Sequence, residues 1–388
     1  MNFQRAIAAA ALGALALTAG CGERSSEPPH SFAYVSNSGS NTVSVIDLTS
    51  LKVVRTLATG SGPAGIAPSP TKDEVYVVNS GSGTVSVIDA TRNQVAGNIA
   101  VGRTPHEISV SGDGKRAWVA NEGSSTVTVI DLDMHRAVAQ IPVGRQPVVA
   151  RVSGDGKFVV AANSGDDTIT LIDGESARVR ATLKVCRTPN SLVILPDASR
   201  ALVGCSGSRQ VASINLKNGA LETLLRVGGT PVDLDMKPDG GEVFVANYEA
   251  QTISAVSPYN DEVNESFLAG DHPVSSLVSA DNSTLFVSNS ASNSVAVFDV
   301  MTRKLITSVQ VGTAPGALAL SPSQNMLLVA NSGSGDVAVL RLDKRRDPKV
   351  QAPNAPGNPA PPQRLLMMIP TGAKPSQIAV KTASREQP

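Results

Sequence analysis

A short element ending in asparagine recurs along the chain at a nearly constant interval. It reads YVSN at Tyr34–Asn37 and returns as YVVN, WVAN, VAAN, FVAN, FVSN and LVAN. The copies end 42 residues apart, with one interval of 84, at Asn37, Asn79, Asn121, Asn163, Asn247, Asn289 and Asn331. A second element, Gly-x-x-Pro, keeps the same period, and its last copy (Gly372, Pro375) arrives 18 residues late. A fixed period near 40 residues predicts a repeat architecture.

Each repeat contains four short runs that are typical of β-strands. In the second repeat they read AGIAPSP, EVYVVN, TVSVID and QVAGNIAVG, with turn sequences between them. Four strands in 42 residues is the size of a β-propeller blade. Second, third and fourth strands each occur eight times, and the first strand does so only if QIAVKT (residues 377–382) is counted. We therefore predict an all-β protein, a single propeller of eight four-stranded blades, closed by pairing of strand 377–382 with the N-terminal strands.

Motifs such as NSGSNTVSVID and VGTAPGALALSP resemble the YVTN family of β-propellers. The resemblance covers residues 31–382, and it implies a propeller fold. Many members of that family have seven blades, so the count of eight rests on the strands of this chain. The late eighth repeat carries DKRRDPKVQAPNAPGNPAPPQ (residues 343–363). Its Pro-rich composition predicts an inserted loop between the third and fourth strands of the last blade, either disordered or read by a partner.

The first residues, MNFQRAIAAAALGALALTAGC, have the pattern of an export signal. One positive charge at Arg5 precedes an uncharged Ala/Leu run that is too short for a spanning helix. The ending LTAGC resembles the lipobox of bacterial lipoproteins, which implies cleavage before Cys21 and lipid attachment to its thiol. An ordinary cleaved signal with a chance cysteine is the alternative. We expect a signal peptide at 1–20, a lipidated Cys21 with a tether to residue 30, the propeller at 31–382 and a tail at 383–388. The protein is then exported and anchored in the cell envelope, in an outer membrane facing the periplasm or at the cell surface.

Composition and motifs exclude several classes of function. The chain has 33 basic and 33 acidic residues and only 3% aromatics, so it lacks the basic field and stacking surfaces of a nucleic-acid binder. No CxxCH motif for c-type heme and no GxSxG elbow occur. The four histidines have no metal-ligand spacing. We therefore assign no catalytic residue, metal or cofactor from sequence, and we expect a monomer.

Function is expected where the blades differ, because identical positions only build the ring. Loops that precede first strands and loops that follow second strands share one face of the disk, which is the Gly-x-x-Pro face. Arg103, Arg145 and Arg187 follow the anchor position on three consecutive blades and form a positive arc there. The candidate ligand-binding residues on this face and on the innermost strands are Arg103, His106, Glu107, Arg145, Arg151, Arg187, Asp233, Asp235, Tyr248 and His272.

Charges on an innermost strand are costly unless they are paired or solvated. Arg151 is therefore expected to pair with Glu107 of the preceding blade, and arginine arcs also bind carboxylates or phosphates. We interpret the chain as a lipid-anchored binding or scaffold module that presents this face to a protein, glycan or anionic ligand. The alternative is a periplasmic enzyme or cofactor-binding propeller, which resembles the lactonases or the partners of heme d1 and quinone oxidoreductases. The sequence leaves catalysis undecided.

Two cysteines fall on the two anchors of a single blade. Cys186 stands at the anchor-glycine position and Cys205 at the anchor-asparagine position, and the other seven blades keep Gly and Asn. Because first and second strands are neighbours, the two anchors are expected to lie close together. We predict that a Cys186–Cys205 disulfide replaces the Gly–Asn contact, with two separate buried thiols as the alternative.

Overall fold

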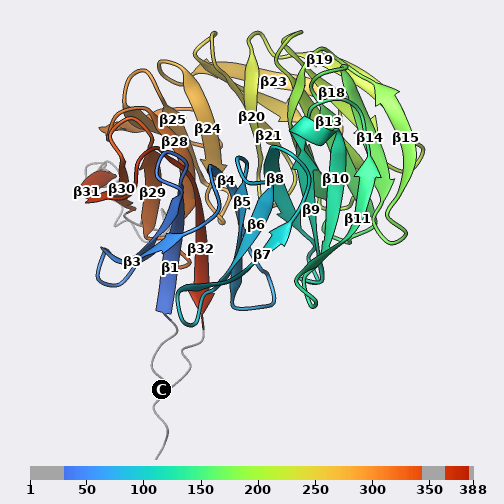
Figure 1. The fold of residues 1–388 in the computed structure, drawn as a ribbon. Helices are drawn as coiled ribbons and strands as arrows, with labels where there is room; N and C mark the ends of the chain where they lie inside the picture. The colour runs from blue at the N-terminus through green and yellow to red at the C-terminus, as the bar shows by residue number, and fades with distance from the viewer. Residues whose placement is uncertain (1–29, 343–362, 384–388) are drawn as a thin grey trace, which may run out of the picture.

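A computed structural model of the chain describes residues 30–342 and 363–383. These residues form eight four-stranded antiparallel sheets arranged as the blades of a propeller (Figure 1), with one 3-10 turn, η1 (Glu122–Ser124). The predicted fold class and blade number are confirmed. The predicted signal peptide, Cys21 with its tether, the inserted loop and the tail lie outside the described residues, apart from single residues at their edges.

We name the blades A to H in ring order. Blade A contains β1 (His30–Asn37), β2 (Thr42–Asp47), β3 (Lys52–Ala58) and β32 (Pro375–Ala383). Blade B contains β4 (Pro63–Pro68), β5 (Glu74–Asn79), β6 (Thr84–Asp89) and β7 (Gln94–Ala100). Blade C contains β8 (Pro105–Val110), β9 (Arg116–Asn121), β10 (Thr126–Asp131) and β11 (Arg136–Pro142). Blade D contains β12 (Pro147–Val152), β13 (Phe158–Asn163), β14 (Thr168–Asp173) and β15 (Arg178–Lys184).

The remaining blades repeat the same order of strands. Blade E contains β16 (Pro189–Ile194), β17 (Arg200–Cys205), β18 (Gln210–Asn215) and β19 (Ala220–Arg226). Blade F contains β20 (Pro231–Met236), β21 (Val243–Asn247), β22 (Thr252–Ser257) and β23 (Glu262–Leu268). Blade G contains β24 (Pro273–Val278), β25 (Thr284–Asn289), β26 (Ser294–Asp299) and β27 (Leu305–Gln310). Blade H contains β28 (Pro315–Leu320), β29 (Met326–Asn331), β30 (Asp336–Arg341) and β31 (Arg364–Pro370).

Both ends of the described chain contribute to blade A and close the ring. Strand β32 pairs antiparallel with β1 along its whole length, as predicted for residues 377–382, and it extends beyond them at both ends. Side chains reinforce the closure, because the hydroxyls of Ser31 and Thr382 lie 2.8 Å apart and those of Ser36 and Ser376 lie 2.9 Å apart. Closure leaves no innermost strand without its neighbour.

The hydrophobic core lies between blades rather than within one. The second and third strands of each blade are buried on both faces, which explains their nearly continuous Val/Ile/Ala sequences. One core cluster joins Val78 and Val85 of blade B to Val119 and Ile130 of blade C, and similar clusters follow around the ring. The outermost strands are largely exposed. Blade-to-blade burial therefore supplies most of the hydrophobic stabilisation.

The Gly–Asn anchors lie together at one face of the disk, which we call the mouth face. In blade C the backbone N–H of Gly102 donates to the side-chain oxygen of Asn121 over 3.1 Å. A Cβ atom on Gly102 would lie 2.7 Å from the Cβ of Asn121, so only glycine fits there. Blade F departs from the predicted register. In this blade the glycine that lies against the anchor asparagine, Asn247, is Gly229. The predicted anchor, Gly228, lies in open space with a φ of 79°.

In blade E, a disulfide joins the two anchor positions, as predicted. The Cα atoms of Cys186 and Cys205 lie 5.7 Å apart. In blades A, B, C, D and F the amide of the anchor asparagine donates to hydroxyls five and seven residues further on. Blade E has Gln210 and Ala212 at those two positions. An asparagine at position 205 would therefore lack these hydroxyl acceptors. Blade H has Asp336 and Ala338 at the same two positions and nevertheless keeps its asparagine, Asn331, whose amide donates to Asp336.

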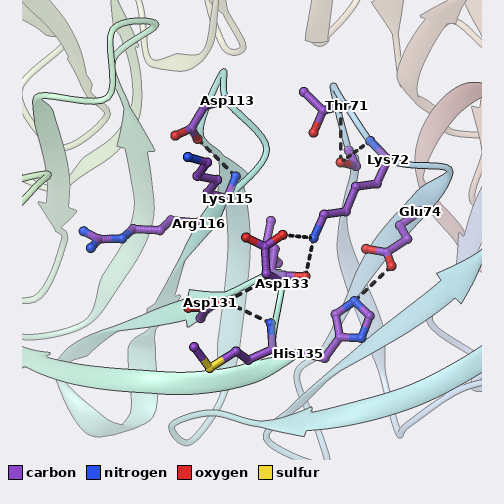
Figure 2. Close-up of polar contacts among 12 residues, drawn as sticks. Thr71, Lys72, Glu74, Asp113, Lys115, Arg116, Asp131, Asp133 and His135 are labelled. Atoms are coloured by element: carbon purple, nitrogen blue, oxygen red, sulfur yellow. Dashed lines mark hydrogen bonds and ion pairs between the residues drawn. The ribbon is translucent and has the colours of Figure 1, made fainter.

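Polar side chains on the opposite face join neighbouring blades. Figure 2 shows Lys72 of blade B, whose Nζ lies 2.7 Å from Oδ1 of Asp133 in blade C and also donates to the Leu132 carbonyl. Nearby, Nε2 of His135 lies 2.9 Å from Oε1 of Glu74.

The same kind of contact recurs between other blades. Arg116 donates to the Gly174 and Glu175 carbonyls of blade D, and Arg200 donates to the Pro258 and Tyr259 carbonyls of blade F. These contacts add to the apolar core. Each joins the start of the second strand of one blade to the turn between the third and fourth strands of the next blade. Within residues 30–342 and 363–383, no helix is long and apolar enough to span a bilayer.

Candidate functional site

A cavity of about 860 Å³ lies on the axis of the ring, and the innermost strands of all eight blades line it. These strands are β4, β8, β12, β16, β20, β24, β28 and β32. Each runs from the mouth face toward the opposite face, so its first residues surround the mouth of the channel. A cavity of this size falls within the range of small-molecule and cofactor sites.

The ring of residues that follows the anchor prolines forms the mouth of the channel. It consists of Ala64, His106, Val148, Asn190, Val232, Val274, Gly316 and Ser376, and all of these except Val148, which packs against the core, line the cavity. Small and apolar side chains dominate it, which leaves the mouth wide. Asn190 donates its amide to the Pro231 carbonyl over 3.1 Å. His106 is exposed and has no hydrogen bond or ion pair among the described residues, so its imidazole is available to a ligand.

Below His106, the predicted pair between Arg151 and Glu107 is present. Nη2 of Arg151 lies 2.7 Å from Oε1 of Glu107, and 47% of the Arg151 side chain is exposed. Both residues line the cavity. The guanidinium therefore offers its remaining N–H groups to the channel while its charge is balanced from the neighbouring blade.

Asp233 and Asp235 lie on the wall formed by blade F. The backbone N–H of Ser276 donates to Oδ2 of Asp233, and the N–H of Val278 donates to Oδ2 of Asp235, each over 2.8 Å. Burial raises the pKa of Asp235 to about 7, and the neighbouring Asp233 carboxylate adds to the rise. Burial also raises the pKa of Asp233. Asp233 lines the cavity, and Asp235 lies one step further from the mouth along β20.

The predicted arginine arc is exposed on the mouth face but does not line the cavity. Arg103, Arg145 and Arg187 lie in the loops that enter the first strands, outside the inner wall. Their backbone N–H groups are held by side chains of the neighbouring loops, as between Arg145 and Asp166 over 2.9 Å. Among the described residues their guanidinium groups form no hydrogen bond or ion pair. They can therefore reach a ligand that projects above the mouth.

Tyr248 and His272 contact each other on the far side of the mouth. Their ring centroids lie 4.4 Å apart. Nδ1 of His272 lies 2.7 Å from Oδ1 of Asp271, which also accepts a hydrogen bond from the amide of Gln251. His272 is therefore in contact with Tyr248 and Asp271, whereas the imidazole of His106 forms no such contact among the described residues. Ser376 and Gln377 were not predicted as site residues, but they line the cavity because the C-terminal strand completes the ring.

Among the described residues, no three His, Cys, Asp or Glu side chains are grouped to hold a metal ion. A second cavity of about 350 Å³ lies on the opposite face, between the turns of blades C and D. Its wall includes Arg116, which is occupied by the carbonyls of the blade D turn. The axial channel is therefore the better candidate for a ligand site.

The fold and its open axial channel define the class of the protein as a ligand-accessible eight-bladed β-propeller. The chain belongs to the YNCE-like beta-propeller family, which matches residues 140–345. Residues 69–191, which contain His106 and Arg151, also match the cytochrome D1 heme domain. A search of the curated proteins finds no match.

Solved structures share the fold at low sequence identity. The dihydro-heme d1 dehydrogenase NirN in complex with DHE is 16% identical, with a TM-score of 0.71, over 90% of this chain and 74% of that chain. Hydrazine synthase of Kuenenia stuttgartiensis is 22% identical, with a TM-score of 0.60, over 72% of this chain and 96% of that chain. A functionally unknown protein from Desulfotomaculum acetoxidans DSM 771 is 17% identical, with a TM-score of 0.61, over 80% of this chain and 99% of that chain.

Proposed function

We propose that this propeller binds an anionic tetrapyrrole of the heme d1 type at the mouth of its channel. The observation that carries the proposal is the open imidazole of His106, which lies on an innermost strand at the mouth of an 860 Å³ cavity. The match of residues 69–191 to the cytochrome D1 heme domain includes this histidine. The similar fold of the dihydro-heme d1 dehydrogenase NirN supports the same class of ligand. The proposal favours the cofactor-binding alternative over a purely scaffolding role.

The residues at the mouth fit such a ligand. A single histidine is a sufficient protein ligand for heme iron, and His106 would fill this role. Ala64, Val232 and Val274, which line the cavity, would provide small apolar contacts for the macrocycle. Arginine side chains bind carboxylates through charge-assisted hydrogen bonds, so Arg151 and the arginine arc would hold the acidic side chains of the ring. The bound group would supply redox chemistry at its iron, and the protein would hold and orient it.

Titration of the purified protein with heme d1, with hemin as a comparison, tests the proposal. We expect a shift of the absorption bands at one equivalent. His106→Ala should lower the affinity by more than the roughly 10–100-fold that loss of an outer-shell partner costs. His135→Ala, in the same blade but on the opposite face, is the matched control and should bind like the wild type. Equal affinity of wild type and His106→Ala, or no binding of either ligand, would contradict the proposal and favour the scaffold.

We further propose that lipid on Cys21 tethers the propeller to a membrane of the cell envelope. The described chain starts with His30 at the face opposite the mouth, because β1 runs from there to Asn37 on the mouth face. The segment between residues 21 and 30 spans at most roughly 30 Å. A tether there would direct the mouth away from the membrane. Cys21→Ala should move the protein from the membrane fraction to the soluble fraction, and an unchanged distribution would refute the anchor.

A further inference from the structure

The innermost strands lie side by side around the channel without a hydrogen-bond ladder between them, so some of their backbone N–H groups need side-chain acceptors. Asp233 and Asp235 of β20 meet this need for Ser276 and Val278 of β24. The acceptor and the donor lie 43 residues apart in both cases. Ser109 of β8 serves Val152 of β12 in the same way, over 3.2 Å and the same separation.

A hydroxyl is therefore enough to accept a backbone N–H of the next innermost strand. Blade F uses a carboxyl group for this purpose at two positions. The pair also differs from the other carboxylates of the protein in its surroundings. Strands β16, β21 and β24, which pack against β20, contain no ionisable residue. Strand β17 also packs against β20, and its one charged residue, Arg200, is bound to Glu222 and Asp261. The charged groups that act on the pair are Arg151, which favours the ionised form, and Glu107, which opposes it. Two carboxyls on one face of a strand cannot both ionise easily in such a wall.

We infer that Asp233 and Asp235 hold one proton between them at the channel wall and exchange it with the molecule that occupies the channel. In the forward direction the carboxyl O–H bond breaks and a new bond forms between the proton and a basic atom of the occupant. The pair is left with two negative charges, and a proton from channel water restores it. Asp233 faces the cavity and makes the exchange, and Asp235 lies behind it as the second half of the pair. The exchange step rests on the proposed function, since it requires an occupant, whereas the storage of the proton does not.

Thermal unfolding without ligand tests the storage of the proton. A carboxyl whose pKa is higher in the folded state binds more protons there than in the unfolded chain, so stability falls as the pH rises toward the folded pKa. The midpoint of unfolding should therefore fall between pH 5 and pH 8 by more in the wild type than in Asp235→Asn. Asparagine keeps the oxygen that accepts the Val278 N–H but does not ionise. Asp239→Asn, in a turn of the same blade where the pKa of the carboxyl is lowered, should follow the wild type over this range.

Hemin binding at the same pH values tests the exchange. The affinity of the wild type for hemin should decrease from pH 5 to pH 8 as the pair ionises, and Asp233→Asn and Asp235→Asn should each flatten this dependence. If the midpoint of unfolding has the same pH dependence in the wild type and in Asp235→Asn, the pair does not hold a proton and the inference is wrong. A pH dependence of hemin binding that persists in both variants makes the pair purely structural. Failure of hemin and heme d1 to bind at any pH overturns the proposed function and the exchange step, while the melting curves still decide whether the pair holds the proton.

Discussion

His106 and His135 lie at opposite faces of the same blade, and their surroundings differ. Nε2 of His135 contacts Glu74, whose other oxygen accepts the hydroxyl of Tyr76 over 2.6 Å. His106 lies at the channel mouth without a partner among the described residues. The comparison teaches that a histidine of the opposite face is occupied in connecting two blades, whereas a histidine of the channel mouth is left open to a ligand. Residue type alone does not separate the two roles.

If this distinction is correct, changes in the scaffold should lower stability and leave tetrapyrrole affinity unchanged. The largest such effect is expected at the disulfide of blade E. Replacement of Cys186 and Cys205 by serine removes a cross-link over 19 residues and should lower the free energy of unfolding by about 3 kcal/mol. Chemical denaturation measures this loss, and hemin titration of the folded variant measures affinity.

A second set of variants identifies what the disulfide replaces. Cys186→Gly with Cys205→Asn restores the anchor residues of the other blades, but Ala212 gives the asparagine no hydroxyl to bind. Addition of Ala212→Ser should therefore recover part of the lost stability. If this triple variant is no more stable than the variant with both cysteines replaced by serine, a Gly–Asn anchor with its hydroxyl acceptor does not substitute for the disulfide.

A smaller loss is expected at the opposite face. Arg200 donates to two carbonyls of blade F, and its guanidinium lies 2.8 Å from Glu222 and 3.2 Å from Asp261. Its side chain is only 22% exposed. Arg200→Met removes the donor to both carbonyls and to Asp261, while Glu222 keeps its bond from Asn215, and should lower the free energy of unfolding by about 2 kcal/mol.

Arg136→Met, at an exposed position of β11, is the matched control for Arg200→Met and should change stability little. Hemin affinity should stay unchanged in both variants. If Arg200→Met weakens hemin binding as strongly as His106→Ala, the division of roles between the two faces is wrong.

Much of the architecture could be predicted because the repeat fixes the register within each blade. The register alone places Cys186 next to Cys205 and brings the C-terminal strand to blade A. The Arg151–Glu107 pair followed from the need to balance charge on neighbouring innermost strands. In blade F the register predicted the wrong glycine. Gly228 has the Gly-x-x-Pro spacing to Pro231, but the adjacent Gly229 is the residue that lies against Asn247.

Contacts between blades were harder to predict than contacts within them. Glu74 and His135 lie 61 residues apart, which is not a multiple of the period, because the start of one blade meets the outer turn of the next. For the same reason, sequence analysis named Asp233 and Asp235 but not the N–H groups of β24 that bind them. The arginine arc was placed on the correct face, but the distance from entry loop to channel wall depends on the tilt of the blades.

The structure of the full-length protein with heme d1 bound tests the central claim most directly. The account predicts one macrocycle at the mouth of the channel, with its iron bound to the imidazole of His106 and its carboxylates directed toward arginines of blades C to E. A macrocycle bound on the opposite face, or at the mouth with its iron bound to His272 in place of His106, would contradict it.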